Sequence, residues 1–153
     1  MQLTRHADYS LRVLIYLSLN RDKNVTIDEI NDFYRISRNH LTKVVHTLSV
    51  NGFINTSRGK HGGMRLARDP GGITIGEVVR QMEPHFKLVE CQSEELGDCR
   101  AAPICSLKSV LDNALEQFLS YLDGYTLADA VRPDASLAYL NKLPIGTSRN
   151  SRD

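Results

Sequence analysis

The chain has 153 residues, of which 41% are hydrophobic and 24% are charged, as is ordinary for a soluble globular protein. No apolar run approaches the roughly 20 residues that span a bilayer, and the N-terminus lacks the apolar stretch of a secretory signal. We therefore expect a cytoplasmic protein without a membrane partner, built as one domain or as one small domain with an added helical element.

The net charge of +1 conceals an uneven distribution. Residues 35–68 contain seven Lys or Arg and no Asp or Glu, whereas residues 69–116 contain nine acidic and four basic residues. This polarity predicts that the first half binds a polyanion and that the second half has another task. A solvated face with chance clustering of charge is the alternative.

Three helices are expected at the start of the chain. Residues 4–20 carry a broad apolar face, formed by Leu11, Leu14, Ile15, Leu17 and Leu19. Thr26 and Glu29 have the spacing of a capping box, which predicts a short second helix that ends near Tyr34. A turn follows at 34–36, and Ser37 is a suitable N-cap for a third helix that continues to about Val50.

The third helix predicts a helix-turn-helix motif that binds DNA. Its apolar residues Leu41, Val44, Val45 and Leu48 lie at i, i+3, i+4 and i+7 and form one stripe for burial. Basic and polar residues occupy the rest of the helix, as expected of a recognition helix. The candidate DNA contacts on it are Arg38, Asn39, His40, Thr42 and Lys43.

A basic, glycine-rich hairpin is expected directly after this helix. The strand candidates are residues 53–56 and 64–67, and the segment between them is Arg58-Gly59-Lys60-His61-Gly62-Gly63. Such a hairpin is typical of the wing of a winged helix, whose cations reach phosphates or the minor groove. We expect Arg58, Lys60 and His61 to contact DNA there. A surface turn without a partner is the alternative.

The second half predicts a dimerisation helix. A helix is expected from Thr74 to about Met82. A long helix is expected from Cys105, and it carries an apolar stripe that the rest of the chain is too short to bury. A second copy would cover it, whereas packing back onto its own winged domain is the alternative. The expected fold is mainly α with a β-hairpin wing. Its expected parts are residues 1–72 as the DNA-binding domain, 73–132 as the connecting helix, cysteine loop and dimerisation helix, and 133–153 as a tail with a disordered end.

The three cysteines, Cys91, Cys99 and Cys105, lie within fifteen residues. An odd number argues against a closed set of disulfides. Thiolates are preferred ligands of zinc, copper(I) and iron–sulfur clusters, so the segment predicts a metal site with three of its ligands. Buried thiols and transient redox thiols are the alternatives.

Several segments together resemble one known family. The chain resembles the iron–sulfur winged-helix transcriptional repressors, and most closely their nitric-oxide-sensing NsrR branch. The resemblance covers about residues 1–132. The segments that carry it are residues 1–4 with Asp8 and Tyr9, residues 37–40, 58–66, 75–80, 83–84 and 125–129, and the three cysteines.

The resemblance implies a homodimer that binds an inverted-repeat operator and represses genes for nitric oxide detoxification. It also implies a [4Fe–4S] cluster, with [2Fe–2S] as the alternative, held by the three cysteines and by Asp8 of the partner subunit. Arg12 would lie beside Asp8, one turn later on the same helix face. His6 and His85 are rival ligands. The spacing between the first two cysteines is longer than in the family, and the histidine ligand that the relative IscR uses after its third cysteine is absent, since no histidine follows Cys105.

Three other functions compete with a nitric-oxide sensor. The same winged-helix regulator could be switched by zinc or by thiol redox, or it could regulate iron–sulfur cluster assembly. An electron-transfer or catalytic iron–sulfur protein is a function of another class, and the expected winged helix counts against it. We expect no enzymatic activity.

Overall fold

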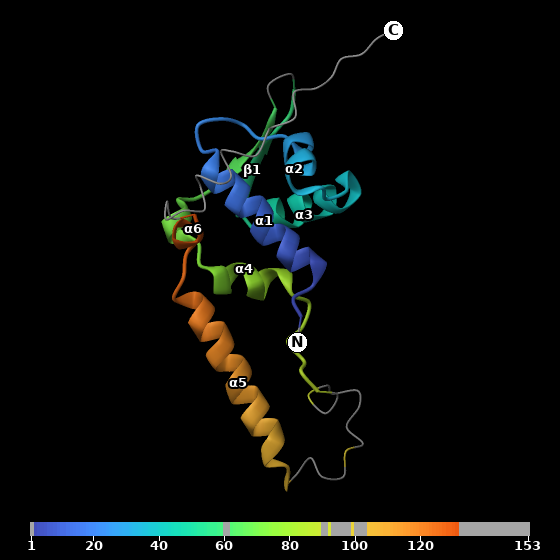
Figure 1. Cartoon of the computed structure of the whole chain (residues 1–153), viewed down its shortest axis with the longest axis vertical. Helices are drawn as coiled ribbons and strands as arrows, with labels where there is room; N and C mark the ends of the chain where they lie inside the picture. The colour runs from blue at the N-terminus through green and yellow to red at the C-terminus, as the bar shows by residue number, and fades with distance from the viewer. Residues whose placement is uncertain (1, 60–61, 90–91, 93–98, 100–103, 132–153) are drawn as a thin grey trace.

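The structure is a computed structural model that describes residues 2–59, 62–89, 92, 99 and 104–131 (Figure 1). Helices α1 to α4 and the hairpin pack together, whereas α5 extends away from them. The mainly helical fold with a small β-hairpin is as predicted from the sequence. In chain order the elements are α1 (Arg5–Leu19), α2 (Ile27–Tyr34), α3 (Arg38–Val50), β1 (Ile54–Ser57), β2 (Gly63–Leu66), the 3-10 helix η1 (Pro70–Gly72), α4 (Ile75–Met82), α5 (Ser106–Asp123) and α6 (Leu127–Ala130).

Helix α1 is central to the core and contacts α3, α4, α6 and β2. Its buried face differs in part from the predicted stripe, because Leu11, Ile15 and Leu19 are only half-buried. Small residues form part of the buried face instead. The buried residues of α1 are Ala7, Ser10, Val13, Leu14, Leu17 and Ser18. The two serine hydroxyls donate to carbonyls one turn earlier, so burial leaves neither unsatisfied.

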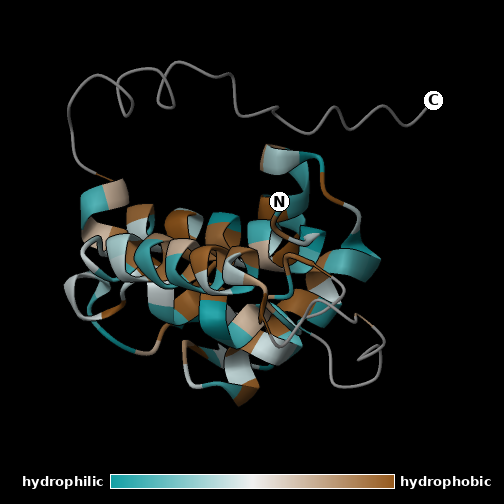
Figure 2. Cartoon of the chain, turned by 90° about the horizontal axis from the view of Figure 1, so that it is seen from below, coloured by the Kyte–Doolittle hydropathy of each residue, from teal (hydrophilic) through white to brown (hydrophobic). Residues whose placement is uncertain are grey.

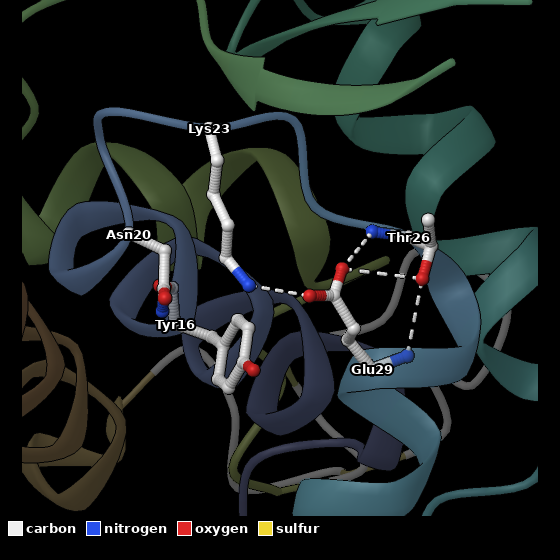
Figure 3. Close-up of polar contacts among 5 residues, drawn as sticks. All are labelled: Tyr16, Asn20, Lys23, Thr26 and Glu29. Carbon is white, nitrogen blue, oxygen red and sulfur yellow. Dashed lines mark hydrogen bonds and ion pairs between the residues drawn. The ribbon is translucent and has the colours of Figure 1, made fainter. Parts of the chain in front are cut away.

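Helix α2 begins with the predicted capping box (Figure 3). The Thr26 side chain accepts a hydrogen bond from the backbone N–H of Glu29, and the Glu29 carboxylate accepts from the backbone N–H of Thr26 at 2.7 Å. Lys23, from the loop before the helix, forms an ion pair with the same carboxylate. These bonds fix the direction in which α2 leaves the loop.

The turn between α2 and α3 depends on Arg35, whose φ of 57° is left-handed. The side-chain amide of Asn31 donates to the carbonyl of Ile36 at 2.7 Å and holds the turn closed. Ser37 occupies the N-cap position of α3 as predicted, but its side chain makes no capping hydrogen bond. The predicted stripe of α3 is buried at all four positions, so the opposite side of this helix is left for solvent.

The hairpin pairs β1 with β2 in antiparallel register, with Ile54 opposite Leu66 and Ser57 opposite Gly63. The observed β1 starts one residue later than the predicted strand, because Phe53 turns into the core, where it is 1% exposed. Val25, from the loop before α2, pairs with Met64 through two backbone hydrogen bonds of 2.8 and 3.0 Å. Gly63 has a φ of +153°, and a Cβ there would lie 2.7 Å from the Val25 carbonyl oxygen. Glycine is therefore required where this third segment joins the hairpin.

Helix α4 connects the hairpin to the rest of the chain. Thr74 caps it by accepting from the backbone N–H of Glu77 at 3.0 Å, and its apolar face is buried against α1. The guanidinium of Arg80 makes two hydrogen bonds to the carboxylate of Asp123 at the end of α5. That carboxylate lies against Gly76, where an added Cβ would be 2.0 Å from Oδ1. The end of α5 thus packs closely on α4.

Helix α5 has no buried residue in the single chain. Figure 2 shows that hydrophobic and hydrophilic residues alternate around the helices, as expected of amphipathic helices. The exposed large hydrophobic residues on or just before α5 are Ile104, Leu107, Val110 and Tyr121. After α5 the chain returns to the core, where Leu127 is fully buried and its N–H donates to the Ile73 carbonyl. No helix among the described residues is long and apolar enough to span a membrane.

Candidate functional site

The exposed side of α3 brings together the predicted DNA contacts on this helix, which we call the reading face. Every one of them is exposed, because the four apolar positions turn the opposite side into the core. The members of the reading face are Arg38, Asn39, His40, Thr42 and Lys43. No acidic residue lies on α3 itself, so the face presents donors and positive charge.

Arg38 differs from its neighbours because it has an acidic partner. Its Nη1 atom lies 2.5 Å from Oδ1 of Asp28 on α2, and both side chains are more than half exposed. A surface pair of this kind contributes little to stability, but it restricts the directions in which the guanidinium can point. The sequence did not predict this contact, because Asp28 lies on α2, before the basic segment. Only the turn at Arg35 brings α2 close enough to α3 for the two side chains to meet.

The wing is the connection between β1 and β2, residues 58–62. Arg58 is exposed at its start, as predicted, whereas Lys60 and His61 lie outside the described residues. Two further arginines on this side have partners. The Nε atom of Arg65 donates to Oδ1 of Asn24 at 2.7 Å, and Arg68 pairs with Glu77 at 2.7 Å. Of the three predicted wing contacts, Arg58 is therefore the one whose position the structure describes.

A cavity of about 220 Å³ lies between α1 and α3, beside the reading face. We call it the α1–α3 cavity. It is lined by Arg5, His6, Tyr9, His40, Lys43 and Val44. Sequence reasoning considered His40 and Lys43 as DNA contacts and missed Arg5, because only the packing of α1 on α3 brings that residue beside them.

Arg12 lies beside Asp8 on α1, as the resemblance implied, and the two side chains form an ion pair. The carboxylate of Asp8 accepts from Nε of Arg12 at 2.9 Å, and its other oxygen lies 2.8 Å from Nη2. This hydrogen bonding raises the pKa of Arg12. The guanidinium carbon also lies 5.9 Å from the ring centroids of both Tyr9 and Tyr34. Arg12 is therefore fixed from three sides and holds the Asp8 carboxylate in a bidentate pair.

The cysteine loop, residues 91–105, is described in part. Cys91 lies outside the described residues; Cys99 is exposed and Cys105 half-buried, and both are free thiols. Cys105 occupies the N-cap position of α5, but its side chain makes no capping hydrogen bond. Negative charge is stabilised at a helix N-terminus. Thiols without other bonds on a connecting segment fit the donor chemistry of an iron–sulfur cluster.

No complete metal site appears within the described part of a single chain. There, no group of three or more His, Cys, Asp or Glu side chains is placed to hold a metal ion. The rival ligands are also separate, since His6 lines the α1–α3 cavity and His85 is exposed after the end of α4. The described residues therefore do not bring Asp8, His6 or His85 together with Cys99 and Cys105.

Comparison with known proteins identifies the family. A family model named Rrf2, described as an iron-dependent transcriptional regulator, matches residues 3–133. The chain belongs to the Rrf2 family. Among Rrf2 relatives, it is 48% identical over 141 residues to the HTH-type transcriptional regulator NsrR of Shouchella clausii (strain KSM-K16), with 92% of this chain and 95% of the relative covered.

Two further comparisons agree with this assignment. The chain is 45% identical over 144 residues to the HTH-type transcriptional regulator NsrR of Bacillus subtilis (strain 168), with 94% of this chain and 99% of the relative covered. The solved structure of T. potens IscR superposes with a TM-score of 0.69 at 21% identity, covering 97% of this chain and 94% of that one. At this identity the structural match supports the Rrf2 fold alone.

Proposed function

We propose that the protein is a nitric-oxide-sensing transcriptional repressor that binds operator DNA as a homodimer while an iron–sulfur cluster is intact. The single observation that carries the DNA-binding part is the reading face, an exposed set of cations and amides on a helix without acidic residues. The similarity to regulators named NsrR supports the sensing part. No feature of the described residues favours an enzyme instead.

The reading face and the wing have distinct tasks in this proposal. Arg38 and Asn39 have the chemistry to pair with guanine and adenine in the major groove, while His40, Thr42 and Lys43 contact bases or phosphates. Arg58 and the wing residues Lys60 and His61 would contact phosphates or the minor groove. Asp28 limits the orientations of Arg38 before DNA arrives, which reduces the entropy lost on binding.

The homodimer is supported by α5. Its 18 residues extend about 27 Å at 1.5 Å per residue, and none is buried in the single chain. Pairing with α5 of a second copy would cover its apolar stripe and place two reading faces on one side of the duplex. Two half-sites about 34 Å apart, in inverted orientation, would follow.

We also propose a division of roles along the chain. Residues 1–72 would bind DNA, 73–132 would bind the cluster and form the dimer, and 133–153 would be a tail that lies outside the described residues. The parts share one core, since Ile73, Val78, Met82 and Leu127 pack in the same cluster as residues of α1. The first two parts therefore differ in function but fold as one unit.

Cys91, Cys99 and Cys105 would hold the cluster together with Asp8 of the partner subunit. We expect the [4Fe–4S] form, with [2Fe–2S] as the alternative. When bound, the cluster supplies iron atoms that react with nitric oxide, a chemistry that side chains alone lack. To bind a cluster, Asp8 would give up or share its two bonds with Arg12. Arg12 would receive the carboxylate again when that ligand bond is lost, and α1 would thereby respond to the state of the loop.

The proposal is tested by selection of DNA and by analysis of the anaerobically purified protein. The protein should enrich duplexes with an inverted repeat from a random-sequence pool, and it should contain iron and acid-labile sulfide that a Cys99→Ala variant lacks. Zinc without sulfide would favour the zinc-switched regulator, and neither metal nor sulfide would favour the thiol switch. Failure to enrich any sequence would contradict the repressor.

A further inference from the structure

The α1–α3 cavity has the composition of an anion site. Its lining combines a guanidinium, an ammonium and two imidazoles with one tyrosine and one valine, and it contains no carboxylate. Three of these residues come from the first half of α1 and three from α3. A concave surface with donors and cations but no acidic residue favours a small anionic group.

The two permanent cations of the cavity are free to bind such a group. Neither Arg5 nor Lys43 makes an ion pair or hydrogen bond through its side chain with another described residue, and both are exposed. By contrast, Arg12 and Arg38, on the same two helices, each have an acidic partner. Asp8, one turn after Arg5, is bonded to Arg12 and does not neutralise the cavity.

The walls of the cavity are fixed by contacts between the two helices. The rings of Tyr9 on α1 and His40 on α3 lie 5.9 Å apart between centroids. Val44 is 1% exposed and belongs to the core. Because His40 and Lys43 also belong to the reading face, a duplex bound to that face would pass beside the cavity.

We infer that the α1–α3 cavity binds a backbone phosphate of the DNA, with Arg5 of α1 as its main cation beside Lys43. This inference rests on the proposed DNA-binding function and extends it to a helix outside the helix-turn-helix and the wing. A guanidinium binds phosphodiester oxygens through paired, charge-assisted hydrogen bonds. Such a contact positions the protein on the duplex and carries no sequence information.

Arg5 and Asp8 lie one turn apart on α1, so this helix would couple DNA binding to the cluster. Arg5 would hold DNA, and Asp8 is the proposed ligand to the partner's cluster, so both tasks fall on one turn of the same helix. A rotation or shift of α1 when Asp8 changes partner would move Arg5 relative to the phosphate. The DNA contact and the sensor would then be linked through a rigid helix.

The test is the salt dependence of DNA binding by the full-length, cluster-loaded protein and its Arg5→Gln variant. The probe is a mixed-sequence duplex of about three helical turns, because a phosphate contact does not require an operator. Loss of one contact lowers the slope of log K against log salt by about 0.9. Because the homodimer would lose one contact in each subunit, the slope should fall by about 1.8, and the affinity difference between wild type and variant should shrink roughly twelvefold between about 50 and 200 mM salt. Arg21→Gln, which removes an exposed cation outside the cavity, is the matched control and should leave the slope unchanged.

A second measurement locates the phosphate. Duplexes that contain the selected inverted repeat, and that carry one neutral methylphosphonate at successive positions, should include a position that weakens binding by wild type and not by Arg5→Gln. An unchanged slope for Arg5→Gln, in a variant with wild-type circular dichroism, overturns the inference. If Arg5→Gln changes the mass of the dimer or its cluster content but leaves the salt-dependence slope unchanged, the inference is also overturned. The cavity would then belong to the subunit interface. If wild type binds no DNA at all, the proposed function itself has failed.

Discussion

At the scale of single residues, Asp8 is the position on which the proposed site depends most. The resemblance placed Arg12 beside Asp8, one turn later on the same helix face, and the structure shows the two side chains paired there. The aromatic contacts that fix Arg12 could not be predicted, since Tyr34 comes from another helix. Cys99 and Cys105 are free thiols in the structure, and Cys91 lies outside the described residues. Their use as ligands stays a prediction.

Replacing Asp8 with alanine tests its assignment as the fourth ligand. A cluster that loses one ligand should have an altered visible absorption spectrum and should be lost roughly tenfold faster under air or chelator, as is usual when a site loses a supporting group. Asp22→Ala, at an exposed acid in the loop after α1, is the control and should match wild type. An unchanged spectrum and unchanged nitric oxide sensitivity of Asp8→Ala would remove Asp8 from the site.

At the scale of elements, the helices that carry local signals were the most predictable. Thr26 with Glu29 determines where α2 begins, and the four apolar positions of α3 determine which side is exposed. The sequence could not predict that Ser37 leaves its capping bond unmade or that Phe53 belongs to the core, because both depend on how α2 and the hairpin dock. The left-handed Arg35 is another such case, since glycine or asparagine is the usual signal there.

The capping box of α2 leads to a prediction about pH. Partial burial raises the pKa of Glu29, but the ion pair with Lys23 and the bonds to Thr26 outweigh it, so the pKa is lowered. A lowered carboxylate pKa stabilises the fold above the unfolded-state value and loses this contribution as the pH falls through the folded-state value. Glu29→Gln keeps a capping side chain and removes the charge. It should lower the free energy of unfolding by about 0.5 kcal/mol at pH 7 and by nothing once the pH is well below 4.5.

Urea unfolding of both proteins across this pH range measures the difference. About 1 M salt should reduce the difference at neutral pH, since much of it is the exposed ion pair with Lys23. A difference that grows as the pH falls would contradict the assigned direction of the pKa shift.

At the scale of the whole molecule, α5 is the element that a single chain leaves unexplained. The sequence predicted a long helix with an apolar stripe, and in the single chain no residue of that helix is fully buried. The sequence could not predict how α5 is attached, because the bond between Arg80 and Asp123 and the contact at Gly76 join residues more than forty positions apart. Through α4, α5 is connected to the start of α1, where the Thr4 N–H donates to the Glu83 carboxylate at 2.7 Å.

The dimer is tested by placing a charge within the apolar stripe of α5. Leu111 lies in this stripe, one helical turn after Leu107. Leu111→Glu should convert the dimer to a monomer and weaken binding to an inverted repeat by more than about 100-fold, because the two half-sites would no longer be engaged together. Ser109→Glu adds the same charge on the opposite side of the helix and should leave both properties as in wild type. Sedimentation velocity and fluorescence anisotropy measure them. A dimeric Leu111→Glu protein with unchanged affinity would place the dimer contact elsewhere.

The most direct test of the account is an anaerobic titration of the cluster-loaded protein with nitric oxide, in which visible absorbance and operator binding are followed in the same sample. We predict that the cluster absorbance falls and that operator binding is lost over the same range of added nitric oxide. Bleaching of the cluster with full retention of operator binding would contradict the proposal that this protein senses nitric oxide through its cysteine loop.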